Sequence, residues 1–176
     1  MPRVFIAIGS NIEPAENVRK AIPLLAREAR IVAVSTFYRT KPLDRPGQPD
    51  FYNGVVEIET DTPPLELKQD VLRRIEQELW RTWDADKRSA RTIDLDIVVY
   101  GDLVLAEGNV RIPDPEIAVR PFLAIPLAEL APGMLLPDTG RGVAEIAAAF
   151  AHHGMEPLHE FTKTLRKESA DGSRKG

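Results

Sequence analysis

The most informative stretch of this 176-residue sequence covers positions 91–97, which read Arg91-Thr92-Ile93-Asp94-Leu95-Asp96-Ile97. It opens a run over residues 92–100 that is rich in β-branched residues, which predicts a strand. Side chains alternate between the two faces of a strand, so Asp94 and Asp96 point the same way while their apolar neighbours point into the core. The two carboxylates are therefore expected about 7 Å apart on one surface.

Two carboxylates on one surface repel each other unless a cation lies between them. Magnesium prefers hard oxygen ligands and takes one or two carboxylates together with substrate phosphates. A pair of metal ions about 4 Å apart could bridge both aspartates and a polyphosphate. A pair of aspartates two positions apart is a weak pattern, however, and also fits the solvent face of an antiparallel strand with basic partners.

Outward from this strand, the chain predicts an α+β fold. Strands are expected over residues 4–8, 31–38 and 52–60, with amphipathic helices over residues 14–29 and after Thr62-Pro63. The order strand, helix, strand, strand, helix, strand matches a ferredoxin-like βαββαβ core with an antiparallel sheet, helices on one face and the other face free for a ligand.

The rest of the chain is expected to be less regular. Prolines punctuate the sequence from Arg111 onward and predict short turns and loops, followed by a helix over about residues 143–152. Residues 39–50 form a long loop that suits a binding element. We expect one domain over residues 1–161 and a disordered polar tail over residues 162–176.

The composition excludes several classes of protein. The chain has a formal net charge of -4, so it lacks the overall positive charge that would attract nucleic acid or an anionic membrane. We therefore expect it to bind neither. The absence of cysteine excludes disulfides and thiolate nucleophiles. A cytoplasmic monomer is the simplest expectation.

A local basic cluster surrounds the aspartate pair within this acidic chain. Arginine and lysine side chains chelate phosphate oxygens, so the cluster predicts a triphosphate site beside the metal site. The sequence contains neither a GxxxxGK[ST] nor a GxGxxG motif, which leaves P-loop and Rossmann readings unsupported. Members of the cluster are Arg81, Lys87, Arg88 and Arg91 upstream, and Arg111 and Arg120 downstream.

Several ordered motifs together resemble the hydroxymethyl-dihydropterin pyrophosphokinases of folate biosynthesis. The similarity runs from about residue 3 to residue 138. It is carried by residues 91–97 and by Gly9-Ser10-Asn11, Phe37-Tyr38-Arg39-Thr40, Gln48-Pro49-Asp50-Phe51-Tyr52-Asn53, Ile112-Pro113, Arg120-Pro121-Phe122 and Pro126-Leu127. The resemblance implies a ferredoxin-like fold, two Mg²⁺ ions, and transfer of pyrophosphate from ATP to the pterin hydroxymethyl group with release of AMP.

The resemblance also implies roles for individual residues. Asp94 and Asp96 would hold both metal ions and act in catalysis with Arg81 and Arg91. Hydroxymethyl-dihydropterin would contact Thr40, Leu43, Phe51, Asn53 and Phe122. ATP would contact Glu76, Lys87, Ile97 and Arg120, and the local basic cluster adds Arg88 and Arg111 as further candidate ATP contacts. Helical periodicity alone places Glu76 on the helix surface.

The sequence departs from the family at three places. Trp83 stands where many members have a second arginine, Arg88-Ser89-Ala90 replaces a common Trp-Gly-Pro run, and Asp114 follows Pro113 in place of a common histidine. Arg88 and Arg111 are the candidates to replace the lost phosphate contact.

Two other functions remain open from sequence. A ligand-binding or RNA-binding module on the same fold would need basic and aromatic residues on the central strands, where this chain has a carboxylate pair. A different metal-dependent nucleotidyl or phosphoryl transferase would differ in whether AMP or ADP is released.

Overall fold

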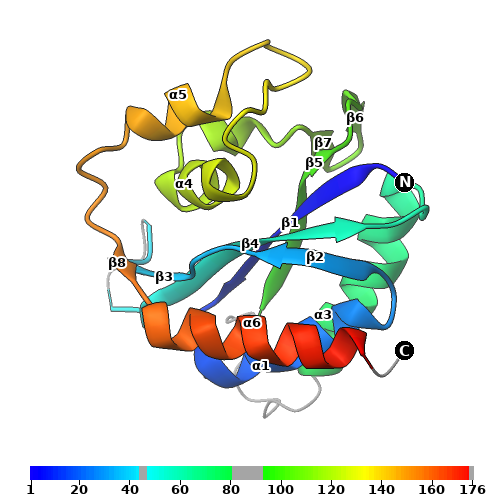
Figure 1. Cartoon of the computed structure of the whole chain (residues 1–176), viewed down its shortest axis with the longest axis vertical. Helices are drawn as coiled ribbons and strands as arrows, with labels where there is room; N and C mark the ends of the chain where they lie inside the picture. The colour runs from blue at the N-terminus through cyan, green and yellow to red at the C-terminus, as the bar shows by residue number, and fades with distance from the viewer. Residues whose placement is uncertain (44–46, 81–92, 175–176) are drawn as a thin grey trace.

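The computed structural model describes residues 1–43, 47–80 and 93–174 and is built around one antiparallel sheet (Figure 1). The strand order is β5-β1-β4-β3-β8, and β2 also pairs with β4. The first and fourth core strands, β1 and β5, are neighbours, which is the order of a ferredoxin-like sheet. The strands are β1 (Arg3–Ser10), β2 (Arg30–Val34), β3 (Tyr38–Thr40), β4 (Phe51–Glu59), β5 (Asp94–Tyr100) and β8 (Glu156–Pro157).

One face of the sheet is covered by the two helical connections of the βαββαβ core. The first connection is α1 (Pro14–Ala26), and the second is a continuous run of α2 (Pro64–Glu66), the π-helical segment η1 (Leu67–Leu72) and α3 (Arg73–Trp80). Their apolar side chains pack with Val4, Ile6 and Ile8 of β1 in the larger hydrophobic core. The predicted α+β, ferredoxin-like fold is therefore confirmed.

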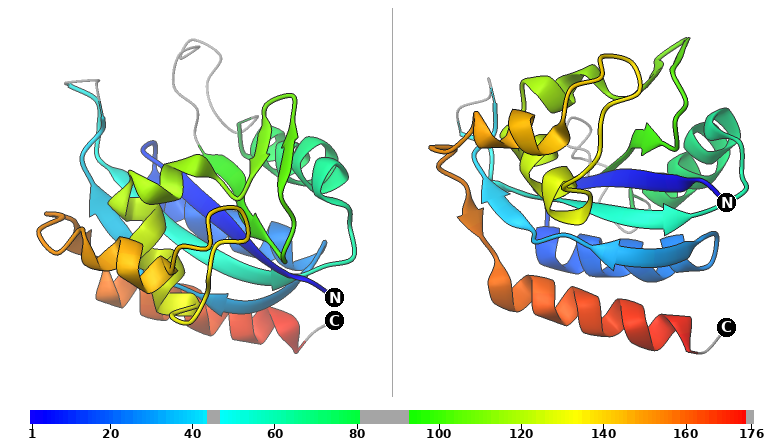
Figure 2. Two further views of the ribbon diagram at one scale, coloured as in Figure 1. Left: turned by 90° about the horizontal axis from the view of Figure 1, so that it is seen from above. Right: turned by 45° about the horizontal axis from the view of Figure 1, so that its top comes forward.

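The sequence predicted that the opposite face would be free, but only part of it is. The helices α4 (Pro121–Leu130) and α5 (Val143–Ala148) cover part of it and enclose a second core around Phe5, Val55 and Val99 (Figures 1 and 2). The expectation of short helical turns and loops between Arg111 and the helix predicted over about residues 143–152 is wrong for α4, whereas α5 lies within that predicted helix. Pro121 begins this ten-residue helix, and its missing amide hydrogen costs no hydrogen bond because the first amides of a helix have no partner within it. Leu123 and Leu127 are buried against the sheet.

The expected disordered tail is also a helix, α6 (His159–Ser173), which runs beside α1 (Figure 2). Its polar composition hides a narrow buried stripe that contains Thr162 and Leu165. The Thr162 hydroxyl accepts a hydrogen bond of 2.9 Å from the Phe37 amide, and the Arg166 Nε atom donates to the Val34 carbonyl. Helix α6 thus holds the chain between β2 and β3.

The single strand expected over residues 31–38 is two strands, because the chain leaves the sheet between Val34 and Tyr38. At the break, the Ser35 hydroxyl accepts a hydrogen bond of 2.8 Å from the Val55 amide, which replaces the lost ladder contact. After β5, the chain forms a separate hairpin of β6 (Leu105–Glu107) and β7 (Val110–Ile112). No helix among the described residues has the length and apolar character needed to cross a membrane.

Truncation of Leu165 tests whether α6 is part of the folded structure. Leu165→Ala removes a fully buried side chain between α6 and the sheet, so we expect the free energy of unfolding to fall by about 2–4 kcal/mol. Urea denaturation followed by circular dichroism measures the change. Lys167→Ala, on the exposed side of the same helix, is the control and should shift stability by less than about 0.5 kcal/mol. Equal shifts would mean that α6 does not pack as described.

Candidate functional site

The candidate site lies on the same sheet face as α4 and α5, in the part that these helices leave uncovered. The strand register brings its residues together. Gly9 of β1 pairs with Asn53 of β4 and with Asp94 of β5, and Ala7 pairs with Asp96. Paired residues in antiparallel strands project to the same face. The aspartates therefore share a surface, as predicted, while Leu95 is fully buried on the other face.

Small residues on β1 form the floor between these polar side chains. A Cβ atom placed on Gly9 would lie 2.5 Å from the Asn53 Oδ1 atom, closer than side-chain atoms approach one another. Gly9 therefore lets the Asn53 amide lie across the first strand toward Asp94. This gives a physical reason for the Gly9-Ser10-Asn11 motif that sequence periodicity alone did not supply.

Of the residues predicted to bind the pterin, Thr40, Phe51 and Asn53 lie together on β3 and β4, whereas Leu43 and Phe122 lie on other segments. Asn53 Nδ2 donates a hydrogen bond of 2.7 Å to Thr40 Oγ1, and Thr40 pairs with Phe51 across β3 and β4. Leu43 lies in the following loop with half of its surface exposed. Phe122 lies in the first turn of α4 and packs on the edge of the second core.

The aspartate pair fits a hard divalent cation. Asp96 has a half-exposed side chain, and both carboxylates offer oxygen ligands from one strand. Within the described residues, no group of three or more histidine, cysteine, aspartate or glutamate side chains is arranged to hold a metal. Magnesium is commonly bound by one or two carboxylates plus substrate phosphates, so a pair of aspartates is a sufficient protein contribution.

Strand β5 is an edge of the sheet, and side chains from the preceding helical run satisfy its outer backbone groups. Leu95 receives both kinds of contact: its amide donates to Glu76 Oε2 at 3.1 Å, and its carbonyl accepts from Lys68 Nζ at 2.7 Å. Two positions before Leu95, the Ile93 carbonyl accepts a hydrogen bond of 3.3 Å from Trp80 Nε1. These three side chains fix the strand that carries the aspartates.

Glu76 is buried, which corrects the surface position that periodicity predicted. Burial raises the pKa of its carboxyl group above the ordinary value of 4.5. The Leu95 amide and the Lys68 charge lower this pKa, and the charges of Asp94 and Asp96 raise it further, so the net shift is upward. The nearby aspartates therefore influence Glu76 although its hydrogen bond is to the backbone.

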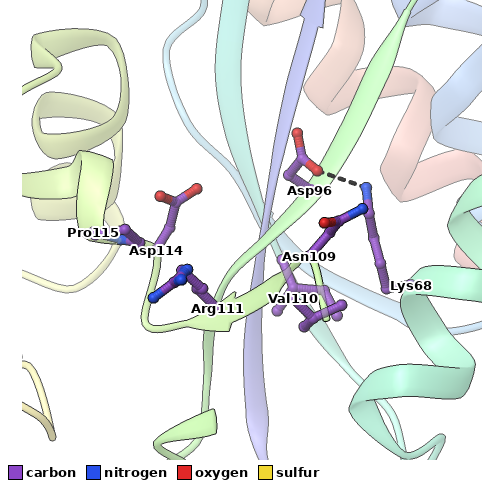
Figure 3. Close-up of a pocket in the computed structure, with 8 residues that line it drawn as sticks. Lys68, Asp96, Asn109, Val110, Arg111, Asp114 and Pro115 are labelled. Carbon is purple, nitrogen blue, oxygen red and sulfur yellow. Dashed lines mark hydrogen bonds and ion pairs between the residues drawn. The ribbon is translucent and has the colours of Figure 1, made fainter. Parts of the chain in front are cut away.

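A pocket of about 150 Å³ lies beside Asp96, between β5, β7 and the turn that follows (Figure 3). It brings together Ile97 and Arg111, which the sequence predicted near ATP, with residues that the sequence did not select. Figure 3 shows the Lys68 ammonium group directed at Asp96 and the Asp114 carboxylate toward the other end of the pocket. The lining consists of Lys68, Asp96, Ile97, Asn109, Val110, Arg111, Asp114 and Pro115.

Asp114 has a clear structural contact in this pocket wall. Its carboxylate accepts a hydrogen bond of 2.9 Å from the Glu116 amide and caps the short 3-10 helix η2 (Pro115–Ala118). Burial raises the Asp114 pKa, and the negative charges of Glu116 and Asp96 add to the rise. The pocket thus has an acidic group at the position where the sequence resemblance predicts a histidine.

Of the remaining basic residues of the predicted site, the structure describes Arg120 alone. Arg120 precedes α4, is half-buried and lies 3.8 Å from Glu116, and it is not among the residues that line the pocket. Arg81, Lys87, Arg88 and Arg91 lie outside the described residues. Lys68 was missed because it follows the apolar Leu67 in a helix and belongs to no sequence motif; only the fold brings it to β5.

A pH series tests the raised Glu76 pKa. A carboxyl group whose pKa is higher in the folded state favours folding only while it is protonated, so Glu76 lowers stability as the pH rises from about 4.5 through its folded pKa. We expect Glu76→Gln to gain stability relative to the unsubstituted protein over this pH range. Urea midpoints at several pH values measure the difference. Glu78→Gln, at an exposed position of α3, is the control, and the same pH trend in both variants would contradict the assignment.

Comparison with known proteins places the chain in a family. The family model described as 7,8-dihydro-6-hydroxymethylpterin-pyrophosphokinase (HPPK) matches residues 5–132. The 2-amino-4-hydroxy-6-hydroxymethyldihydropteridine pyrophosphokinase of Pseudomonas aeruginosa is 41% identical over 159 residues, which cover 89% of this chain and 96% of that protein. The protein of the same name from Haemophilus influenzae is 36% identical over 162 residues, covering 90% and 99% of the two chains.

A solved structure supports the fold. Wild-type HPPK-DHPS of Plasmodium falciparum superposes with a TM-score of 0.66 at 13% identity, over 85% of this chain and 41% of that chain. The chain thus spans less than half of that longer protein, and at this identity the likeness concerns the fold alone. With the family model covering most of the chain and close relatives matched almost end to end, the chain belongs to the 7,8-dihydro-6-hydroxymethylpterin-pyrophosphokinase family.

Proposed function

We propose that the protein transfers pyrophosphate from ATP to the hydroxymethyl group of 6-hydroxymethyl-7,8-dihydropterin, giving the pterin diphosphate and AMP in folate biosynthesis. The observation that carries this proposal is the row across three strands in which Asn53, Gly9 and Asp94 are paired neighbours. It sets an amide suited to a heterocycle beside a carboxylate suited to a metal. The match to the family over residues 5–132 supports the same activity.

The acceptor would bind at the Asn53 end of this row. An asparagine amide offers both donor and acceptor atoms, which can match the polar edge of a pterin. The hydrogen bond to Thr40 orients the Asn53 amide, and Gly9 leaves room for it. Leu43, Phe51 and Phe122 are the predicted apolar partners of the flat ring system.

The nucleotide would bind at the Asp96 end, over the pocket of Figure 3. Arg111 supplies a guanidinium group for phosphate oxygens, and Ile97 supplies an apolar wall. Glu76, Lys87, Arg88 and Arg120 stay predicted contacts of ATP, and Arg81 and Arg91 stay predicted catalytic residues. The observed contact of Glu76 is to the Leu95 amide.

Asp94 and Asp96 would hold two Mg²⁺ ions. When bound, such ions neutralise polyphosphate charge and lower the pKa of a coordinated hydroxyl group. The protein's own part is to fix the two carboxylates on one strand and to keep Asp94 at the border between the acceptor and nucleotide ends. Catalysis would then rest on positioning and charge neutralisation, without a covalent intermediate on the protein. A cytoplasmic, monomeric enzyme remains the expectation.

Product analysis with an Asp96 variant tests the activity and the metal site together. With magnesium, ATP and the pterin alcohol, we expect one AMP for each pterin diphosphate formed. Asp96→Asn should lower kcat by about a thousandfold or more, because an amide cannot supply the ligand charge. Asp102→Asn, an exposed aspartate after the same strand, should retain activity. Release of ADP instead of AMP would indicate a different phosphoryl transferase, and near-normal turnover of Asp96→Asn would refute the metal site.

A substitution at Gly9 tests the acceptor site. Gly9→Ala places a methyl group against Asn53 Oδ1, so the amide must shift from its position over Gly9. We expect kcat/KM for the pterin to fall by about ten- to hundredfold, with a smaller change in KM for ATP. Steady-state kinetics with each substrate varied in turn gives both values. Gly133→Ala is the matched control, because its added Cβ atom would meet no neighbour within 4 Å. A loss confined to ATP binding would place Asn53 at the nucleotide instead.

A further inference from the structure

Lys68 contacts two groups of strand β5 at once. Its Nζ atom donates to the Leu95 carbonyl at 2.7 Å and forms an ion pair with Asp96 Oδ1 at 2.5 Å (Figure 3). The Lys68 side chain is only 28% exposed, whereas that of Asp96 is 53% exposed. The ammonium group is therefore the more firmly held member of the pair.

The Leu95 contact anchors the ammonium group independently of Asp96. Leu95 is fully buried, and its carbonyl belongs to the backbone of a strand that pairs with β1 along its inner side. The helical segment that carries Lys68 is fixed in turn by Leu67 and Leu72, both buried in the larger core. A change in the Asp96 rotamer would thus leave the positive charge of Lys68 close to the site.

A divalent cation on Asp96 would lie very close to this charge. Magnesium binds carboxylate oxygens at about 2.1 Å, so an ion on the same Oδ1 atom would lie roughly 4 Å from Lys68 Nζ. Like charges at that distance repel, and the lysine already neutralises the carboxylate that would attract the ion. A cation arriving alone therefore meets a weakened site. A cation arriving with a polyphosphate brings enough negative charge to offset both positive groups.

We propose that Lys68 makes binding of the divalent cation at Asp96 depend on the nucleotide, by competing with the free cation for the carboxylate and attracting the polyphosphate that accompanies it. This inference rests on the proposed metal-binding role of Asp94 and Asp96. Lys68 acts on the cation through Asp96, so it is a positioning residue. By thermodynamic linkage, the same coupling makes the nucleotide bind better when the cation is present.

The alternative role for Lys68 is purely structural, as a donor that covers the edge of β5. The two roles predict opposite changes in the affinity for the free cation when Lys68 is removed. If Lys68 only held β5 and Asp96 in place, its removal would loosen the site and weaken cation binding. If Lys68 competes with the cation, its removal strengthens binding of the free cation.

The test measures Mn²⁺ binding with and without a nucleotide. Electron paramagnetic resonance of free Mn²⁺ gives the dissociation constant for the metal alone and for the metal with α,β-methylene ATP, in which the α–β bridge that the reaction would break is blocked. Lys68→Met keeps the apolar stem, and Lys68→Gln keeps a donor for the Leu95 carbonyl. Both remove the charge. We expect either variant to bind Mn²⁺ alone about tenfold more tightly, and the enhancement of Mn²⁺ binding by the nucleotide analogue to fall by about the same factor.

Two controls separate this inference from the proposed function. Lys20→Met removes a lysine that pairs with Glu16 on α1, and it should change neither dissociation constant. Asp96→Asn should abolish the tight Mn²⁺ complex of the unsubstituted protein with the analogue; if that complex does not form or does not depend on Asp96, the proposed metal site is wrong. If the complex forms normally but the neutral Lys68 variants, shown to be folded by circular dichroism, bind Mn²⁺ alone equally or less tightly, the competition is refuted and the metal site stands.

Discussion

The outer edge of strand β5 is the constraint on which the site depends. A strand at the end of a sheet leaves every second amide and carbonyl without a ladder partner, and buried groups of this kind must find another. Glu76 and Lys68 satisfy the two outward groups of Leu95, and Trp80 contacts the carbonyl of Ile93. Because Asp94 and Asp96 alternate with these residues along the strand, the same contacts fix the carboxylates on the open face. The helical run from α2 to α3 therefore holds the strand that carries the site in place.

The open face owes its shape to where the chain places large and small side chains. Phe5 of β1 belongs to the second core and Ala7 packs against it, whereas Gly9, further along the same face, has no side chain. Helices α4 and α5 pack around the large side chain of Phe5, and the predicted site residues Asn53 and Asp94 flank Gly9. The residues at alternate positions of one strand thus decide which part of this face the helices cover.

Residues with a regular period were predictable from sequence, and residues placed by long-range contacts were not. The alternation around Asp94 and the apolar stripe from Leu67 to Leu79 each depend on neighbours a few positions away, so the strand and the helix follow from local pattern. Helix α6 was missed because two buried side chains among polar ones give little signal until the gap between β2 and β3 is known. Lys68 was missed, and Glu76 was predicted at the helix surface, for a related reason: a charged side chain can leave the solvent when a distant strand supplies its partner.

The charges that line the pocket beside Asp96 bear on the form in which a nucleotide could enter. Lys68 and Arg111 supply two positive groups, and Asp96 and Asp114 supply two carboxylates. A polyphosphate without metal would meet repulsion from the acidic groups that offsets the attraction of the basic ones. With divalent cations bound to it, the same polyphosphate would satisfy all four, because the cations face the aspartates and the phosphate oxygens face the cationic side chains. Asp114 would strengthen this preference, since it adds a carboxylate to the wall. If the nucleotide binds here as proposed, this alternation of charge would favour its metal complex over the free anion.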